Sequence, residues 1–266
     1  MSRAILFDST LCAGCRECEK GCAGRWGLAY NDAIAADEKL SARKLTTIQT
    51  RGERYTRKLC MHCLTPSCAS ACPVGALQKT GLGPVTYEES RCIGCRYCMV
   101  ACAFQVPVYE WSSRTPRVKK CNLCYERGAK GKPTACSEAC PTGATVSGER
   151  ESLIAEAERR ITEKPSEYYP AIYGIEEVGG TSVLFLSDAP FDALGLKTVP
   201  SDTLPMLTGR VLALVPDVVS AGAVLLGGVY WLTHRRAAVA AAERSGGKRS
   251  KAEARIEEPE PEEELR

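Results

Sequence analysis

Histidine is scarce in this chain of 266 residues, which has only His62 and His234. Zinc sites that combine cysteine and histidine ligands are therefore disfavoured. Cysteine is absent from the last 126 residues, because all sixteen cysteines lie between Cys12 and Cys140. The N-terminus, MSRAILFDSTLC, lacks the long apolar stretch and the small-residue cleavage site of an ordinary signal peptide. The disulfide scaffold of a secreted protein is disfavoured for that reason.

The sequence also lacks the motifs of a substrate-converting enzyme. The stretch GLGPVT at 81–86 has no third glycine of a dinucleotide-binding loop. The C-x3-C-x2-C pattern of radical-SAM enzymes is missing, and no flavin or phosphate-binding loop is evident. We therefore expect no catalytic residue, and a complete enzyme with its own active site is the less favoured reading.

Charge is divided unevenly along the chain. Residues 1–150 hold 22 Lys and Arg against 13 Asp and Glu, whereas residues 151–266 hold 13 against 19. A basic half could indicate nucleic-acid binding, but no aromatic and basic stacking motif accompanies the charge. A 4Fe–4S core with its four thiolates carries about −2, and four such sites would nearly neutralise this half. We interpret the excess as compensation for buried anionic clusters and expect no nucleic-acid partner.

The cysteines form four sets with nearly the same internal spacing. Each set begins C-x2-C and ends C-x3-C, and the middle gap is two, four, two and eleven residues in turn. In order, the sets are Cys12, Cys15, Cys18 and Cys22; Cys60, Cys63, Cys68 and Cys72; Cys92, Cys95, Cys98 and Cys102; and Cys121, Cys124, Cys136 and Cys140. Structural zinc sites use two ligand pairs, whereas a cysteine triplet followed by a fourth cysteine is typical of 4Fe–4S loops.

The residues around the cysteines fit such loops. Gly14 and Gly94 lie where the backbone must pass close to inorganic sulfide. The fourth cysteine of each set is expected at the start of a helix, for which Pro73 and Pro141 in two sets would be suitable first residues. His62, inside C-M-H-C, is interpreted as a hydrogen-bond donor near a cluster rather than a ligand. The spacing leaves open which sets pair, because the second and third or the third and fourth could form one compact unit.

Three stretches resemble the electron-transfer iron–sulfur subunits of membrane-bound respiratory oxidoreductases. They are FDSTLCAGCRECEKGC; LCMHCLTPSCASACPVGAL with CIGCRYCMVACAFQVPVYEW; and YGIEEVGGTSVLFLSDAPFDALGL. This family includes the beta subunit of formate dehydrogenase-N and the iron–sulfur partner of membrane-bound uptake nickel–iron hydrogenase. The third stretch is the most specific, because it contains no ligand and generic ferredoxins lack it.

The resemblance implies an α+β fold in which residues 1–150 form two nested ferredoxin-like lobes with four 4Fe–4S clusters. The first and fourth sets would share one lobe, and the second and third sets the other. The implied ligands are Cys12, Cys15, Cys18 and Cys140 for cluster 1; Cys22, Cys121, Cys124 and Cys136 for cluster 2; Cys60, Cys63, Cys68 and Cys102 for cluster 3; and Cys72, Cys92, Cys95 and Cys98 for cluster 4. All sixteen cysteines would bind iron, and none would bind zinc.

Residues 151–205 are expected to pack on the cluster domain as a helix and a strand. The stretch RESLIAEAERRITEK has an amphipathic pattern and predicts a helix that ends before Pro165. The apolar residues on one side of this helix are Leu153, Ile154, Ala157 and Ile161. The stretch VGGTSVLFLSDAP predicts a turn followed by a short buried strand.

Residues 206–234 are predicted to form a single transmembrane anchor. The segment 211–233 is long enough to cross a bilayer, and Tyr230 and Trp231 suit its interface. Pro216 should kink the first turns, and Asp217 should lie at the interface or against a partner helix. The basic residues that follow predict that the charged, disordered tail at 235–266 is cytoplasmic and that the cluster domain is periplasmic.

The resemblance implies a relay of electrons from a catalytic subunit to an integral membrane subunit that reduces quinone, through haem b or directly. The catalytic partner would be a molybdenum or tungsten formate dehydrogenase subunit, or alternatively the subunits of a nickel–iron hydrogenase. With no signal peptide, the domain would be exported with a signal-bearing twin-arginine partner, which favours formate dehydrogenase. Membrane lipid is the remaining expected contact. A free multi-cluster ferredoxin is the less favoured alternative, because it would not need an anchor.

Overall fold

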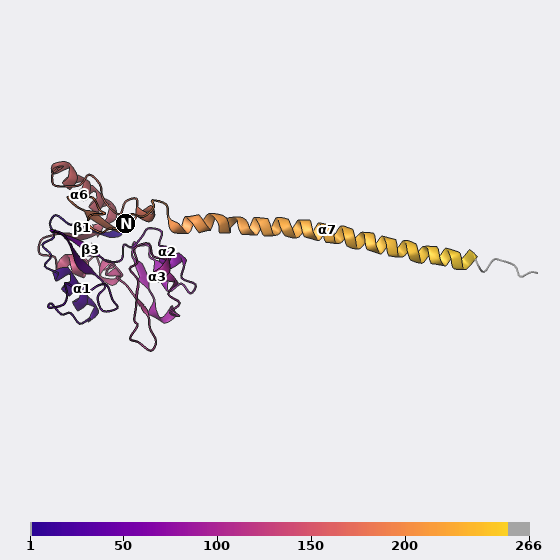
Figure 1. The fold of residues 1–266 in the computed structure, drawn as a ribbon, viewed down its shortest axis with the longest axis horizontal. Coiled ribbons are helices and arrows are strands. Elements are labelled where there is room, and N and C mark those ends of the chain that lie inside the picture. The colour runs from indigo at the N-terminus through magenta and orange to yellow at the C-terminus, as the bar shows by residue number, and fades with distance from the viewer. Residues whose placement is uncertain (1, 255–266) are drawn as a thin grey trace, which may run out of the picture. The chain divides into compact units, whose positions relative to one another are not determined.

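The computed structural model describes residues 2–254 of the chain (Figure 1). The chain divides into two compact units, Met1–Leu207 and Thr208–Arg266. All sixteen cysteines belong to the first unit, and the apolar segment predicted to be an anchor lies almost entirely in the second.

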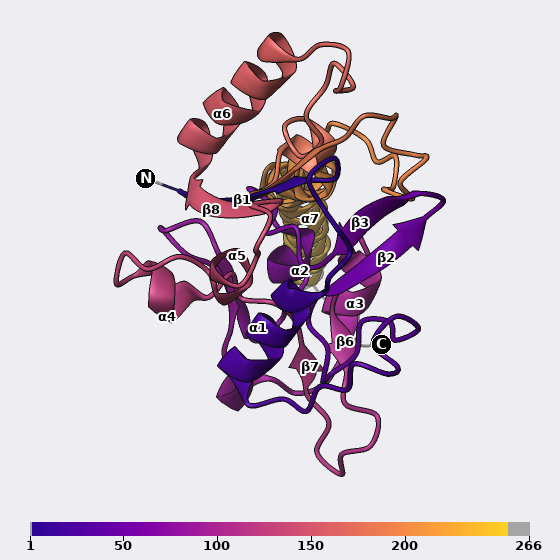
Figure 2. The same cartoon turned by 90° about the vertical axis from the view of Figure 1, so that its left-hand side faces the viewer.

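A three-stranded sheet forms the centre of the first unit. Strand β1 (Arg3–Asp8) pairs antiparallel with β8 (Thr145–Glu149) and parallel with β9 (Val183–Leu186). Helix α6 (Arg150–Glu163) packs against β1 and β8 on one face of this sheet (Figure 2). The other face carries Phe7 and contributes to the apolar core that also contains several of the cysteines. Strand β1 precedes the first cysteine, and strands β8 and β9 follow the last one. The sheet therefore joins the two ends of the segment that contains the cysteines.

Three two-stranded antiparallel hairpins complete the sheets formed by residues 2–254. They are formed by β2 (Thr47–Arg51) and β3 (Arg54–Lys58), by β4 (Leu77–Lys79) and β5 (Val85–Tyr87), and by β6 (Val108–Tyr109) and β7 (Val118–Lys119). Antiparallel pairing brings the two outer ends of a hairpin together. Cys72, which precedes β4, thereby lies near Cys92, which follows β5. Strands β1 and β8 also pair antiparallel. Cys12, which follows β1, therefore lies near Cys140, which precedes β8.

Short helices carry many of the cysteines. They are α1 (Glu17–Trp26), α2 (Ser67–Ser70), α3 (Tyr97–Ala101), α4 (Tyr125–Gly128) and α5 (Ala135–Glu138), with the 3-10 turns η1 (Glu89–Arg91) and η2 (Glu177–Gly179). Helix α1 packs against α5, and α2 packs against α3. A Cβ on Gly21 of α1 would lie 2.8 Å from the carbonyl oxygen of Ala135, so the first contact requires glycine. The helices bring the first set to the fourth and the second set to the third.

Two elements after the cysteines form as the sequence predicts. Helix α6 ends two residues before Pro165, and its buried side includes Leu153 and Ala157. Strand β9 is buried at all four positions, and η2 supplies the turn before it. Both predictions succeed because the apolar pattern of these segments matches the surface that they cover.

Helix α7 (Leu204–Ala254) contains the segment predicted to be an anchor (Figure 1). It is continuous through Pro216, and its part from Leu204 to Arg244 is long and apolar enough to cross a membrane, by length and composition. The prediction of a disordered tail from residue 235 is wrong as far as Ala254, because the helix continues there. The run of alanines after Arg236 is the physical reason, since alanine has the highest helix propensity. Residues 255–266 lie outside the described residues.

Candidate functional site

All sixteen predicted ligands are free cysteines, with no disulfide among them. Cys15 and Cys95 are exposed, and the other fourteen are buried or half-buried. Buried free thiols at this density have no structural cross-linking role. They provide soft sulfur ligands in a region that water reaches poorly, which is the donor set of iron–sulfur clusters.

Two cavities are lined by the cysteines of two predicted ligand groups. One small cavity has Cys22, Cys121, Cys124 and Cys136 in its lining. The other small cavity has Cys72, Cys92, Cys95 and Cys98 in its lining. Each cavity thus presents one complete group of four thiols, the group that the resemblance implies for cluster 2 or cluster 4. The residues present fit a four-thiolate cluster.

The cysteines implied for cluster 3 lie close to one another. Burial raises the pKa of Cys63, and the neighbouring sulfurs of Cys60, Cys102 and Cys68 raise it further. Burial likewise raises the pKa of Cys68 to about 12, with added effects from Cys60 and Cys102. Cys102 therefore lies with the second set, although it closes the third set in the sequence.

The cysteines implied for cluster 1 show the same kind of proximity. Burial raises the pKa of Cys12, as do the sulfurs of Cys140 and Cys15, while a hydrogen bond from the backbone of Gly14 lowers it. Cys12 also contributes to the raised pKa of Cys18, which burial brings to about 12. Cys140, from the end of the fourth set, thus lies with the first three cysteines of the chain.

Neighbouring ligand groups also approach one another. Cys18 of the cluster 1 group interacts electrostatically with Cys136 of the cluster 2 group. Cys121 of the cluster 2 group interacts with Cys60 of the cluster 3 group. Cys98 of the cluster 4 group interacts with Cys68 of the cluster 3 group. These three approaches connect the groups in the order 1, 2, 3, 4.

Within residues 2–254, no three His, Cys, Asp or Glu side chains lie in an arrangement that could hold a single metal ion. The four thiolates of a cubane each bind a different iron atom, so they stand further apart than the ligands of one ion. Four thiols can therefore hold a cubane without forming a site for one ion.

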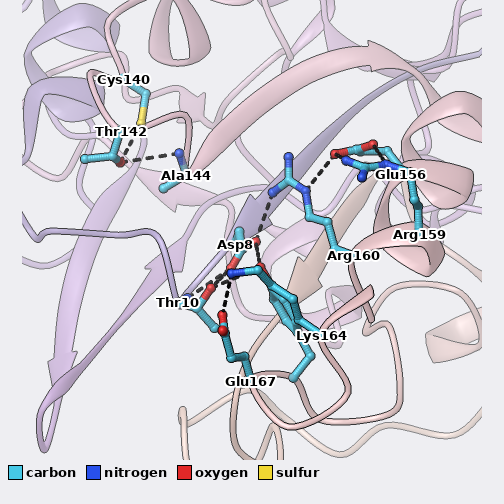
Figure 3. Close-up of polar contacts among 11 residues, drawn as sticks. Asp8, Thr10, Cys140, Thr142, Ala144, Glu156, Arg159, Arg160, Lys164 and Glu167 are labelled. Carbon is cyan, nitrogen blue, oxygen red and sulfur yellow. Dashed lines mark hydrogen bonds and ion pairs between the residues drawn. The ribbon is translucent and has the colours of Figure 1, made fainter. Parts of the chain in front are cut away.

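Hydrogen-bond donors surround several of the sulfur atoms. The backbone N–H of Ala76 donates to Cys72 Sγ at 3.2 Å, and that of Leu123 donates to Cys121 Sγ at 3.3 Å. The hydroxyl of Thr142 lies 3.7 Å from Cys140 Sγ (Figure 3). Burial alone would raise the pKa of Cys140, but backbone donors and Thr142 lower it overall. Donors of this kind stabilise negative sulfur, whether as a free thiolate or as a cluster ligand.

Gly14 and Gly94 occupy equivalent places in the first and third sets. Both have positive φ values, +66° and +72°, as the sequence interpretation requires. A Cβ on Gly14 would lie 2.4 Å from the ring of Tyr55, and one on Gly94 would lie 3.0 Å from the hydroxyl of Tyr109. A tyrosine therefore packs on the tight turn in each loop, and only glycine fits beneath it.

The expected position of the fourth cysteine at a helix start is wrong. The third cysteine of every set is instead the second residue of its helix, as Cys18 is in α1. The fourth cysteine follows one turn later, so the two sulfurs share one side of the chain. Pro73 and Pro141 consequently follow the short helices α2 and α5 rather than begin a helix.

His62 is completely buried between two ligands of the cluster 3 group. Its Nδ1 accepts a hydrogen bond from the backbone N–H of Val85 at 2.9 Å. Burial and the positive charges of Lys120 and Lys79 lower the pKa of His62, so the ring is neutral and Nε2 carries the proton. Nε2 has no hydrogen-bond partner among residues 2–254. Its role as a donor toward a cluster stays a prediction.

Sequence reasoning did not single out the buried cations near the sulfurs. Arg57 lines the cavity of the cluster 2 group, and Lys120 directly precedes Cys121 and donates to the carbonyl oxygen of Val85. Lys79 donates to the carbonyl oxygen of Cys63 at 2.8 Å. The basic excess of residues 1–150 was the available signal, but a charge count does not show which cations are buried.

The comparison with protein families defines the class of this protein. Residues 52–150 match the family described as the 4Fe–4S dicluster domain, and this stretch includes the second, third and fourth sets. The chain is therefore an iron–sulfur protein that binds 4Fe–4S clusters.

Three relatives match over most of their length. A protein of Nitratidesulfovibrio vulgaris is 38% identical over 260 residues, which cover 92% of this chain and 70% of the relative. The hydrogenase-2 operon protein HybA of Escherichia coli O157:H7 is 36% identical over 238 residues, 73% of each chain. The formate dehydrogenase iron–sulfur subunit of Haemophilus influenzae is 32% identical over 252 residues, 86% of this chain and 80% of the relative.

These relatives confirm the resemblance found in the sequence. The chain belongs to the family of iron–sulfur electron-transfer subunits of formate dehydrogenase- and hydrogenase-type complexes.

Proposed function

We propose that the chain holds four 4Fe–4S clusters, with the ligands that the resemblance implies, and passes electrons along them. The observation that carries the proposal is the pair of cavities, each lined by the four cysteines of one ligand group. The mutual proximity of the thiols supports the two remaining groups. Each cluster, when bound, supplies a site for one electron.

The approaches between ligand groups support a linear relay in the order 1, 2, 3, 4. Groups 2 and 3 lie in the middle of that order. The two exposed cysteines belong to the end groups, Cys15 to group 1 and Cys95 to group 4. Ile93 and Tyr97, beside Cys95, are exposed apolar side chains of the kind that a protein partner covers. Electrons would therefore enter and leave at the two ends.

The chain's own residues hold and insulate this relay. The sulfurs receive hydrogen bonds from backbone N–H groups, and most of the cysteines are shielded from water. No bound substrate is required for such a role, and we propose that this chain is not an enzyme by itself. Its substrate chemistry would belong to a catalytic partner.

We propose a formate dehydrogenase subunit with molybdenum or tungsten as that catalytic partner. The formate dehydrogenase iron–sulfur subunits support it with 32–33% identity. A nickel–iron hydrogenase is the second candidate, supported by the 36% identity to the hydrogenase-2 operon protein HybA. In either case an integral membrane subunit would accept the electrons and reduce quinone, with or without haem b.

Helix α7 would anchor the chain in the membrane. Val224, Leu225 and Leu226 are each at least 68% exposed, and this apolar surface has no protein cover within the described residues. Lipid or a membrane subunit would cover it, with the cluster domain on the periplasmic side and the C-terminus in the cytoplasm.

Purification of the full chain from detergent-solubilised membranes tests the proposal. We expect a catalytic subunit and a membrane subunit to co-purify. Molybdenum or tungsten in the complex would support formate dehydrogenase, and nickel would support hydrogenase. Recovery of the chain alone from the soluble fraction, with its iron bound, would contradict the proposed role and support a free ferredoxin.

A further inference from the structure

Arg57, on strand β3, is the largest side chain in the fully buried part of the protein, with an exposed fraction of 2%. Its Nε donates to Thr46 Oγ1 at 2.9 Å, and its Nη1 donates to Thr145 Oγ1 at 3.3 Å. Both partners are neutral hydroxyl groups. Within residues 2–254, Arg57 forms no ion pair with a carboxylate. A buried cation without an anionic partner is costly, so its charge needs another explanation.

The groups around the guanidinium are cysteine sulfurs from two ligand groups. Arg57 and Cys136 line the same cavity of the cluster 2 group, and the guanidinium interacts electrostatically with this sulfur. It also interacts electrostatically with Cys18 of the cluster 1 group. An arginine guanidinium stays protonated in proteins, so this buried side chain carries a positive charge. One guanidinium thus faces both groups.

The nearby acid does not compensate Arg57. Glu19 is buried beside Cys18, but it already forms ion pairs with Arg16 at 3.1 Å and Lys44 at 2.8 Å. The sulfurs themselves become anionic when they bind iron, because cluster ligands are thiolates. Arg57 is therefore electrostatically satisfied only when the two neighbouring groups carry their clusters.

We infer that Arg57 is a shared positioning charge for clusters 1 and 2 that raises the reduction potentials of both. The inference rests on the proposed function, since it takes the two ligand groups to hold clusters. Uptake of one electron at either site adds one negative charge, and no bond is formed or broken. A fixed positive charge nearby stabilises the reduced form, and burial protects the interaction from screening by salt.

Two variants separate the charge of Arg57 from its shape. Arg57→Gln removes the charge but can still donate to a threonine hydroxyl, whereas Arg57→Lys keeps the charge with altered hydrogen bonds. Arg25→Met is the matched control, because Arg25 also acts on a cluster 2 ligand, Cys124, but is partly exposed and paired with Glu126 at 2.9 Å. Its charge is screened by water and by its partner, so its removal should shift the potentials less.

The experiment is a redox titration of the full-length protein in detergent, followed by EPR, with iron measured in every sample. We expect Arg57→Gln to weaken electron uptake at least tenfold at two of the four clusters, a fall of about 59 mV for a one-electron couple. Arg57→Lys and Arg25→Met should leave all four potentials near those of the unchanged protein. Loss of iron from Arg57→Gln but not from Arg57→Lys would also support a requirement for the charge.

Other results of the same titration would contradict the role inferred for Arg57. Unchanged potentials in iron-replete Arg57→Gln, or the same fall in Arg57→Gln and Arg57→Lys, would overturn the inference. Equal loss of iron from both variants would show a role in shape alone. A low iron content in the unchanged protein would instead refute the four-cluster proposal, so the two failures can be told apart.

Discussion

Cys102 shows how far the place of a ligand in the sequence can differ from its place in the fold. In the sequence it closes the set that begins at Cys92, yet its sulfur lies near Cys60, Cys63 and Cys68. It directly follows α3, whereas Cys98 lies at the beginning of that helix. One turn of helix thus separates a ligand of the proposed cluster 3 from a ligand of cluster 4.

Double substitutions test this exchange of ligands. Cys102→Ala and Cys60→Ala should each lose one cluster, which leaves about twelve irons per chain. The double variant Cys60→Ala/Cys102→Ala should also retain about twelve, because both ligands serve one cluster. Cys98→Ala/Cys102→Ala should retain only about eight, because two clusters lose a ligand. Iron analysis that gives the reverse order for the two double variants would refute the assignment.

The raised thiol pKa values predict how cluster loss depends on pH. Burial is the main cause that raises the pKa of Cys18, Cys22 and Cys68 to about 12, so without iron these thiols are protonated at neutral pH. Loss of a cluster therefore takes up protons and becomes more favourable as the pH falls. Iron release to a chelator should be faster at pH 6 than at pH 8. A faster release at pH 8 would contradict this prediction.

At the scale of elements, helix α6 is joined to the central sheet by a buried ion pair. Arg160 Nη1 donates to Asp8 Oδ2 at 2.9 Å, and the carboxylate is completely buried (Figure 3). Tyr168 donates to the same oxygen at 2.9 Å, and the hydroxyl of Thr10 donates to the other at 2.6 Å. These contacts connect strand β1, which leads to the first cysteine, with the part of the chain that follows the last one.

Removal of the cation should destabilise this junction. Arg160→Ala leaves a buried carboxylate without its charged partner, and we expect a loss of about 3 kcal/mol in the free energy of unfolding. Arg159→Ala is the matched control on the same helix, because its ion pairs with Glu156 and Glu163 lie at the surface. It should cost no more than about 0.5 kcal/mol. Equal losses in thermal unfolding would contradict the role given to Asp8 and Arg160.

The sequence predicts local elements better than their partners. The amphipathic pattern of α6 and the apolar run of β9 determine those elements almost entirely. The pairing of β9 with β1 joins segments about 180 residues apart, and spacing alone contains no information about that register. The helix starts within the cysteine sets were also mispredicted. The third cysteine of each set is the second residue of its helix, whereas the fourth cysteine was expected at the helix start.

At the scale of the whole molecule, the regular cysteine spacing was sufficient to predict the class of cofactor. The distribution of ligands between neighbouring sets required the family resemblance, since the spacing permits more than one pairing. The role inferred for Arg57 could not be predicted from the sequence, because it depends on the burial of this side chain between two ligand groups. Such burial depends on the packing of β3 against segments distant in the chain.

The division into two units predicts that the anchor can be removed. A chain that ends at Thr203, before α7, should retain its iron and move from the membrane fraction to the soluble fraction. Fractionation followed by iron analysis checks both parts. A truncated chain that stays with the membrane by itself would place the membrane contact in the cluster domain instead.

The iron content of the purified full-length protein tests the central claim most directly. The account predicts about sixteen irons and as many acid-labile sulfides per chain, because four 4Fe–4S clusters occupy the four groups of cysteines. A value near eight irons, or zinc bound in stoichiometric amount, would contradict the four-cluster relay.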